Sequence, residues 1–532
     1  HEGRRLDGTC NNLIYPTRGG RHTPNVRLLL SGLSKDGQEL PLARPARMAA
    51  VQDGRVSDQR FTQLLSYALI ALTGDVVAIF DSVNYVLWKP YCCVPQGKKD
   101  RDCVPNKIPE DDTVHQFSGI RCQNMTRPQT FQSAGCVKND TAPERVSTFP
   151  LPSPITVSTT PSFDLSGLYG SDLPKLKKAR LLEGGWLKTE EENGKIWPPS
   201  VKTPASVCLL NEKPRETRYG GNGLLGSNLF LIWLWRHHNF IATQLRLVNP
   251  CWDDEKLFQT ARDLNIAYMM QIYFYEMSAD LMGYDNLVRE GVLSRTSGFR
   301  DIYNEKLYPQ ISVEFPFSLR WAHLLQEGRV KMYDSEGYYL KEIKMVNLTV
   351  RTGYLVDTLE FITQGAFRQP GGNIDDYVID PDLGEKSLGP LQTILDVSTN
   401  DLAKNRYFGF YNRSLFQGCT LVYIFLTIKF QRVELLSQVY KHIEDIDLMA
   451  GMWLERRNYG SVAPTFYCLI VDQLKRTIMS DRHWYERPNR PNAFTLEQLL
   501  EIRKATMARL LCDVGDSVTE IQPKAFLRAS PR

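Results

Sequence analysis

Helical patterns dominate the hydrophobic and polar positions of this chain. Apolar residues cover most faces of a predicted helix over Asp58–Val83. Leu224–Asn249 predicts a long buried helix, and Asp253–Gly283 predicts another with two acidic residues in its first turn, where they interact favourably with the helix dipole. Three further helices are predicted in the C-terminal part, over Arg432–Met449, Ala463–Met479 and Thr495–Cys512.

Strand patterns are few. Arg329–Tyr333 and Tyr338–Lys344 predict one hairpin with its turn at residues 334–337. Residues 1–60 are turn-rich and basic, and they predict an extended N-terminal segment. Because the sequence contains no internal repeat and no Gly/Ser-rich linker, we expect one large, mainly α domain over residues 1–532 with a few short strands.

Composition excludes several classes of protein. The 532 residues include 64 Lys and Arg against 60 Asp and Glu, and a net charge of +4 is too small over this length to indicate nucleic-acid binding. Aromatic residues at 11% exclude a disordered or collagen-like chain. The longest apolar run, Leu224–Trp235, is interrupted by Gly, Ser and Asn. It falls short of the about 18 apolar residues that would predict a membrane span.

Five of the eleven cysteines are clustered within residues 92–154, a segment too long and too rich in Pro, Asn, Thr and Asp for an ordinary connection. Their spacing lacks the CxxC pairs or short Cys/His sets of a structural zinc site. An extracellular disulfide framework fits better, and the odd total leaves at least one thiol free or paired outside the chain. The clustered residues are Cys92, Cys93, Cys103, Cys122 and Cys136.

Three N-glycosylation sequons agree with secretion. They begin at Asn124, Asn139 and Asn347, and two of them lie in or beside the cysteine cluster. The sequence opens with His1-Glu2-Gly3 and no signal peptide, which we interpret as a mature or trimmed start. We therefore expect a secreted glycoprotein.

Familiar catalytic motifs are absent or excluded by context. Gly221–Gly226 matches GxGxxG, but no buried strand precedes it, so we interpret it as a glycine-rich entry to a helix. His237 and His238 point about 100° apart on a helix and are interpreted as core or surface histidines. Neither HExxH nor GxSxG occurs. His323 lies on an apolar helix one turn after Arg320 and suits either a core histidine or an axial haem ligand.

A short segment after the cysteine cluster alternates oxygen-bearing residues over seven positions. Such a pattern suits a hard cation such as calcium, although a plain turn would have the same composition. The residues are Thr160, Ser162, Asp164 and Ser166.

Together these segments resemble the animal haem peroxidase family, in its secreted peroxinectin-like and chorion-peroxidase-like branch. The resemblance covers almost the whole chain. Leu234–Ala242 is similar to the family's LREHNRLA helix, and the cysteine cluster follows the family's pattern. The family fold is a large, mainly α-helical domain with little sheet. The other matching stretches are Asp7–Asn12, Leu168–Ser171, Asp445–Gly451, Gly460–Cys468 and Asp481–Glu486.

The resemblance implies a haem site. It places the proximal iron ligand at His323, in a segment similar to the family's FRFGHS, in which Arg320 takes the arginine's place. It places the asparagine behind that ligand at Asn412. Such an asparagine accepts from the imidazole N–H and makes the ligand more electron-donating.

The distal side departs from the family's GQFIDHD motif. There the glutamine lies near halide and iron, the first aspartate is esterified to haem, the histidine is the acid–base catalyst and the second aspartate binds calcium. One register keeps Asp81 as the haem-linking carboxylate and replaces the other three groups by Ala78, Ser82 and Val83. A register shifted by two residues puts Asp81 at the calcium position and Phe80 at the histidine. Neither register contains a histidine.

Two more distal groups change in the same comparison. Counting back from the match at His238 places the family's distal arginine and its second haem-linking glutamate on Gly220 and Gly223. A small gap would bring Arg218 into the arginine's place. With Val83 in place of the calcium aspartate, we also expect the calcium loop to bind its cation weakly or not at all.

The family's cysteine pattern implies specific disulfides, each worth roughly 2–4 kcal/mol in the loop-entropy model. Cys512 has no evident partner in that pattern. The implied pairs join Cys92 or Cys93 to Cys103, Cys122 to Cys136, and Cys419 to Cys468.

The leading hypothesis is a secreted protein of the peroxidase fold that has lost normal peroxidase catalysis. A positioned acid–base group is worth roughly 10²–10⁴-fold in rate, and serine cannot replace histidine near neutral pH. The protein would still bind haem through His323, or act through extracellular protein partners or a small ligand in the haem cavity, with oligomer formation left open. Two alternatives are an active peroxidase for phenolic or tyrosyl donors with an unorthodox distal side, and a haem-free interaction domain.

Overall fold

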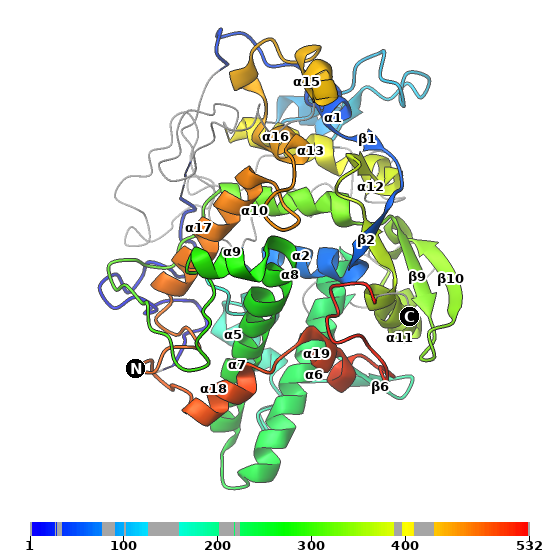
Figure 1. Cartoon of the computed structure of the whole chain (residues 1–532). Coiled ribbons are helices and arrows are strands. Elements are labelled where there is room, and N and C mark those ends of the chain that lie inside the picture. Colours follow the sequence, from blue (N-terminus) through cyan, green and yellow to red (C-terminus); the bar gives the residue numbers. More distant parts are fainter. Residues whose placement is uncertain are drawn as a thin grey trace.

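The computed structural model describes residues 3–26, 28, 34–76, 91–100, 103–125, 159–201, 217–218, 224–349, 351–387, 396–408 and 430–529. Its described part is mainly helical, with long helices through the middle and small two-stranded sheets at the side (Figure 1). Buried residues between Ala43 and Phe526 form one hydrophobic core, in which the tryptophans Trp233, Trp235, Trp321 and Trp453 are fully buried. The expectation of one large, mainly α domain is confirmed.

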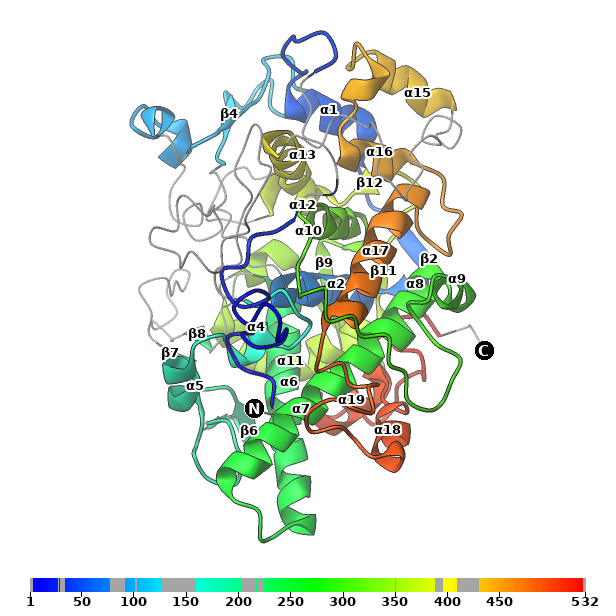
Figure 2. The same ribbon diagram turned by 90° about the vertical axis from the view of Figure 1, so that its left-hand side faces the viewer.

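Three helices form the centre of the molecule: α2 (Gln63–Val76), α6 (Leu225–Val248) and α7 (Asp254–Gln271). Helix α6 packs against both α2 and α7, and the two long helices run side by side in both views (Figures 1 and 2). Gly226 allows this packing, because a Cβ at that position would lie 2.9 Å from the Cα of Tyr67 on α2. The glycine-rich segment therefore enters a helix, as its context predicts.

Helix α7 continues through a π-helix, η4 (Ile272–Ser278), into α8 (Ala279–Met282), so the helix predicted up to Gly283 is confirmed as one rod. Asp253 caps it by accepting from the backbone N–H of Lys256 at 2.7 Å. The helix predicted near the C-terminal part of the core is also confirmed as α17 (Pro464–Ser480).

Three predicted helices differ from the observed elements because tertiary contacts break them. The first begins at α2, since residues before it form strand β2 (Ser57–Thr62), which pairs with β11 (Pro370–Gly372). The helix predicted over 432–449 is observed as two helices, α15 (Phe430–Ser437) and α16 (Leu448–Leu454). The helix predicted over 495–512 is also observed as two, α18 (Leu496–Ile502) and α19 (Met507–Val514), and Thr506 caps the second of them.

The N-terminal segment is not extended throughout, because it contains helix α1 (Ala43–Ala50). The remaining helices are α4 (Ser166–Tyr169), α5 (Leu173–Ala179), α9 (Tyr284–Arg289), α10 (Glu314–Leu319), α11 (Thr352–Arg368), α12 (Pro381–Lys386) and α13 (Val397–Tyr407). The 3₁₀ helices are η1 (Tyr91–Cys93), η2 (Gly97–Lys99), η5 (Arg320–Leu325), η6 (Met345–Leu348) and η9 (Ile443–Asp445).

All sheets in the described residues have two strands. The predicted hairpin is confirmed as the antiparallel pair β9 (Arg329–Tyr333) and β10 (Tyr339–Lys344). A parallel pair joins β1 (Gln52–Asp53) to β12 (Val378–Ile379). The other antiparallel pairs are β3 (Asn106–Lys107) with β4 (Cys122–Gln123), β5 (Glu190–Glu192) with β6 (Lys195–Trp197), and β7 (Ser200–Val201) with β8 (Thr217–Arg218).

Disulfides hold the start of the cysteine cluster. Cys92 is bonded to Cys103, one of the two pairings that the family pattern implied. Cys122 is bonded to Cys93, with Cα atoms 5.8 Å apart, so the implied pairing with Cys136 is wrong. Cys136 itself lies outside the described residues.

The other cysteines divide into bonded and free. Cys468 is disulfide-bonded, while its implied partner Cys419 lies outside the described residues. Cys512 is a free thiol, as its lack of a family partner suggests. Cys10 and Cys251 are also free.

The sequon at Asn124 is buried. Its side chain is 3% exposed, and its Oδ1 accepts from the backbone N–H of Cys92 at 2.8 Å. Burial in the folded chain therefore argues against glycosylation at this residue. Asn347 lies in η6 and is partly exposed, so glycosylation there stays a prediction, and Asn139 lies outside the described residues.

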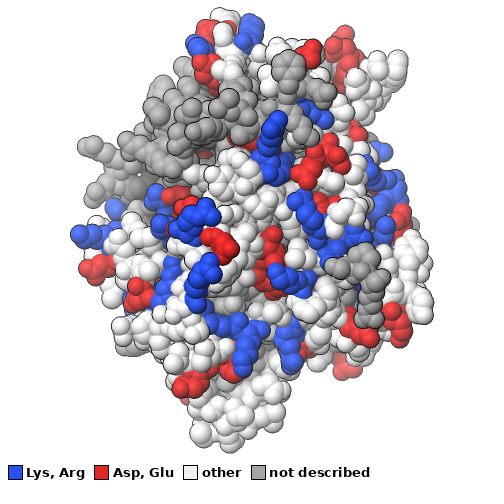
Figure 3. All heavy atoms as spheres, viewed as in Figure 1, with Lys and Arg blue, Asp and Glu red and all other residues white. Residues whose placement is uncertain are grey.

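On the face in Figure 3, Lys and Arg side chains alternate with Asp and Glu, without a broad field of one sign. This distribution agrees with the small net charge of +4 and gives no support for nucleic-acid binding. Within the described residues, no helix is long and apolar enough to cross a membrane.

Candidate functional site

The proximal candidate, His323, lies in η5, directly after α10. Its Nδ1 is 2.9 Å from Oδ2 of Asp401 on α13, a close contact without the geometry of a linear hydrogen bond. Arg320 donates from Nη1 to the other carboxylate oxygen of Asp401 at 2.8 Å. The side chain of Asp401 is fully buried, whereas that of His323 is 18% exposed. The structure thus joins the two predicted residues through a carboxylate that the sequence comparison missed.

Asp401 is ionised in this arrangement. Burial raises the pKa of its carboxyl group, but the charges of Arg320 and His323 outweigh burial and leave that pKa below its ordinary value. A carboxylate beside Nδ1 orients the imidazole and leaves Nε2 as the nitrogen able to bind a metal. Asn412, which the resemblance placed behind the ligand, lies outside the described residues.

The predicted calcium loop is a closely hydrogen-bonded buried turn before and within α4. The hydroxyl of Thr160 donates to Oδ2 of Asp164 at 2.7 Å, and the backbone N–H of Ser166 donates to Oδ1 of Asp164 at 3.1 Å. Ser162 contributes a backbone oxygen that accepts from Asp164 N–H at 3.0 Å. All four predicted residues are buried, and the structure brings them together.

A fifth residue, Asp75 at the end of α2, completes this loop. Its carboxylate accepts from the backbone N–H groups of Leu165 at 3.1 Å and Gly167 at 3.0 Å. Its backbone oxygen accepts from the hydroxyl of Ser166 at 3.0 Å. Figure 2 shows α4 beside the end of α2 and the N-terminal segment. Asp75 therefore joins the end of α2 to the loop around Asp164.

Two carboxylates share this buried loop. Burial and the neighbouring charge of Asp164 raise the pKa of Asp75 to about 8, and burial likewise raises the pKa of Asp164. Repulsion between buried carboxylates is relieved by a cation. Within the described residues no group of three or more His, Cys, Asp or Glu side chains forms a metal site, so hydroxyl and carbonyl oxygens would supply the remaining ligands.

The position of Asp75 offers a third register for the distal motif, earlier than the two read from the sequence. If Asp75 is the last residue of GQFIDHD, the histidine position is Gly74 and the haem-linking aspartate position is Thr73. The glutamine position is then Ile70. The two registers read from the sequence, which placed the motif around Asp81, lie six or more residues later in the chain. The signal in the sequence was a single aspartate at the end of an apolar helix, which carries no motif by itself.

This third register also contains no distal histidine. A Cβ built on Gly74 would have no atom of another described segment within 4 Å. Thr73 keeps its hydroxyl on the helix, donating to the backbone oxygen of Leu69 at 2.8 Å. The residues of the two registers read from the sequence, Ala78, Phe80, Asp81, Ser82 and Val83, lie outside the described residues, as do Gly220, Gly223 and the side chain of Arg218.

The two histidines of α6 belong to a buried polar network. His238 contacts the hydroxyl of Tyr169 through Nδ1 at 2.9 Å and the backbone oxygen of Gly185 through Nε2 at 3.0 Å. Burial lowers the pKa of His238 to about 3, so it stays neutral. His237 contacts Asn265 at 2.7 Å. Both are core histidines, as their spacing predicts.

Comparisons with known proteins agree with this fold. A model of the animal haem peroxidase family matches residues 3–526. The chain is 28% identical over 568 residues to the Drosophila melanogaster protein named peroxidase, covering 99% of this chain and 80% of that one. It is 27% identical over 569 residues to chorion peroxidase of the same organism, covering 99% and 68%. The solved structure of peroxidase A from Dictyostelium discoideum superimposes with a TM-score of 0.77 at 22% identity, covering 99% of this chain and 100% of that one.

Proposed function

Because this chain belongs to the animal haem peroxidase family, we propose that it binds haem through His323 and has lost normal peroxide turnover. The observation that supports the proposal is the contact of Asp75 with the loop around Asp164, because an aspartate of the family's distal motif at position 75 would put Gly74 at the position of the acid–base histidine. We also propose that the protein acts outside the cell, where its two disulfides in the cysteine cluster would persist.

The proximal residues fit haem. His323 presents a partly exposed imidazole whose Nδ1 side is held by the buried carboxylate of Asp401, which leaves Nε2 to bind iron. Haem, when bound, supplies a redox-active iron. The chain's own contribution is to fix the ring and, through Asp401, to make the imidazole a stronger donor than the family's asparagine would. Arg320 keeps Asp401 ionised beside the ring.

The distal residues do not fit peroxide turnover. Cleavage of peroxide needs a group that takes a proton from one oxygen and returns it to the other, and such a group is worth roughly 10²–10⁴-fold in rate. Gly74 has no side chain, and Ile70 has no proton to donate or accept. A bound haem would therefore admit small molecules, but neither position would supply a side chain that transfers protons to or from peroxide.

The residues of the calcium loop favour binding of calcium rather than loss of the calcium site. The expectation of a weak or missing cation rested on Val83, whereas Asp75 places a second carboxylate beside Asp164. Two carboxylates with the oxygens of Thr160, Ser162 and Ser166 form a donor set suited to calcium. We propose that calcium binds here and holds the end of α2 to α4.

Two measurements on protein purified from its source test the function. An absorption spectrum with a Soret band would support haem binding, and its absence would favour a haem-free interaction domain. A steady-state assay with hydrogen peroxide and guaiacol should show negligible turnover beside a related active peroxidase. Activity within about tenfold of that control would contradict the proposal, because loss of acid–base catalysis should cost roughly 10²-fold or more.

A further inference from the structure

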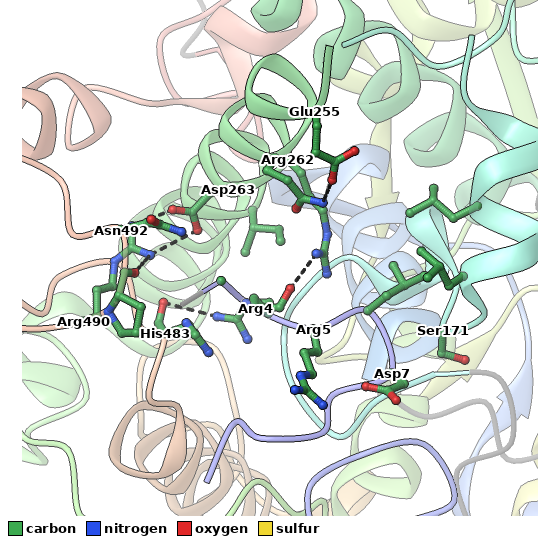
Figure 4. A pocket seen from close by; sticks show the side chains of 17 residues that line it. Arg4, Arg5, Asp7, Ser171, Glu255, Arg262, Asp263, His483, Arg490 and Asn492 are labelled. Atoms are coloured by element: carbon green, nitrogen blue, oxygen red, sulfur yellow. Dashed lines mark hydrogen bonds and ion pairs between the residues drawn. The ribbon is translucent and has the colours of Figure 1, made fainter. Parts of the chain in front are cut away.

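A cavity of about 640 Å³ lies beside the N-terminal segment and shares no residue with the haem site (Figure 4). Its walls come from residues 3–7, from α5, from the first half of α7 and from the loop at 483–492. A cavity of this size can hold a drug-sized molecule.

Two buried guanidinium groups meet at this cavity. Arg262 on α7 is 5% exposed, and its Nη1 donates to the backbone oxygen of Arg4 at 2.8 Å. Its Nε has no partner, and no carboxylate oxygen of the described residues lies within ion-pairing distance of it. Arg4 donates from Nη2 to Asp481 at 2.7 Å, while its Nε and Nη1 have no partner. In Figure 4 the Arg262 side chain points toward the Arg4 backbone at the centre of the cavity.

The carboxylates in the walls are already used. Asp263 accepts from Arg490 at 2.8 Å, and Glu255 pairs with Arg180 at 2.6 Å. Asp7 accepts from the backbone and hydroxyl of Thr9. The charge left without a direct partner is therefore positive.

One buried carboxylate behind the cavity acts on Arg262 through space. This is Asp164, whose oxygens are held by Thr160 and Ser166 in the calcium loop. The carboxylate of Asp263 also acts on Arg262, but burial nevertheless lowers the pKa of Arg262 below its ordinary value, so these charges compensate that of Arg262 only in part. An anion in the cavity would supply the missing partner.

The rest of the cavity wall is apolar. Leu6, Leu176 and Ile266 line it, and Leu173, in the first turn of α5, is 54% exposed. An inorganic anion would leave these side chains uncovered, whereas an organic acid would cover them while its charged end faces the arginines.

We propose that this cavity binds an organic carboxylate with an apolar body, the carboxylate pairing with Arg262 and Arg4 and the body covering Leu173 and Leu176. This ligand site is separate from haem and does not depend on the proposed function.

Calorimetric titration with octanoate tests the proposal, with octan-1-ol as the uncharged analogue. Octanoate should bind with one site per chain and at least about tenfold more tightly than the alcohol, because the alcohol leaves the arginines unpaired. Arg262→Gln should weaken octanoate binding by at least about tenfold. Equal binding of acid and alcohol, or unchanged binding to Arg262→Gln, would overturn the proposal.

Arg457→Gln is the matched control. Arg457 is also a buried guanidinium without a carboxylate partner among the described residues, but it donates to the backbone oxygens of Met452, Glu455 and Ile374, outside the cavity. Its substitution should leave octanoate affinity within about twofold. An equal loss in both variants would show that a general change of the fold, not the cavity, causes the effect, and would overturn the proposal.

Leu173→Glu keeps the test valid if Arg262→Gln does not fold. Leu173 is exposed in the first helical turn of α5, where an acidic residue favours the helix, so the fold should tolerate it. The new carboxylate at the apolar wall should weaken octanoate binding by at least about tenfold, and no change would count against the site.

A peptide that ends in leucine, tested with a free and with an amidated C-terminus, distinguishes the two sources of such a carboxylate, which are protein C-termini and small organic acids. Binding of the free form alone assigns the site to protein C-termini, and binding of octanoate alone assigns it to small acids.

Discussion

Restoring a histidine at position 74 tests most directly which residue of α2 occupies the family's acid–base position. Gly74→His places an imidazole where the contact of Asp75 with the calcium loop locates the family's acid–base group. We expect peroxide turnover by the haem-loaded protein to rise by about 10²-fold. This is the lower end of the range for acid–base catalysis, because Ile70 remains in place of the glutamine.

The structure indicates that this substitution costs little stability. A Cβ at position 74 meets no atom of another described segment within 4 Å, so no described neighbour obstructs the side chain. Gly74 lies in the last turn of α2, and replacing a helical glycine by histidine gains roughly 0.3–0.5 kcal/mol in helix propensity. The thermal midpoint should therefore stay the same or rise slightly. A change in turnover would then report on chemistry and not on folding.

Ser82→His provides the matched control, because residue 82 is the histidine position in the register read from the sequence alone. Both variants are assayed with guaiacol after their haem content has been equalised by the Soret absorbance. We expect a gain for Gly74→His and none for Ser82→His. A gain for Ser82→His alone would refute the register derived from Asp75.

The remaining predictions concern stability and modification. Asp75→Asn should remove most of the increase in melting temperature that calcium produces, because it leaves Asp164 as the loop's only carboxylate; an undiminished increase would place the cation elsewhere. Breaking the disulfide between Cys93 and Cys122, which spans 29 residues, should cost about 3–4 kcal/mol of unfolding free energy in denaturant titrations. Burial raises the pKa of Glu276 to about 7 from 4.5, so the contribution of this group to stability is greatest below pH 4.5 and is lost as pH rises through 7. Glu276→Gln should abolish that loss and be more stable at pH 8 by about 3 kcal/mol, and parallel pH profiles would contradict this. Peptide mapping should find Asn124 unmodified, since its side chain is buried.

Much of the architecture was predictable because it depends on local patterns. Helix α6 and the rod that starts at α7 follow from apolar runs with clear ends, and the hairpin β9–β10 follows from its turn. His323 and the residues of the calcium loop could be placed because each lies in a short segment whose neighbours match the family. The helices predicted over 432–449 and 495–512 were too long, because caps and ion pairs from distant segments break them.

Three features became visible only in the tertiary structure. The partner of His323 is Asp401, which lies 78 residues further along the chain. The partner of Cys122 is Cys93, a choice that spacing left open. The register of α2 depends on hydrogen bonds from Asp75 to a loop 90 residues away. When an apolar helix has lost its motif residues, its sequence matches the motif equally poorly in several neighbouring registers. Contacts between segments distant in sequence therefore decide which residue faces the site, whereas apolar periodicity determines only that a helix forms.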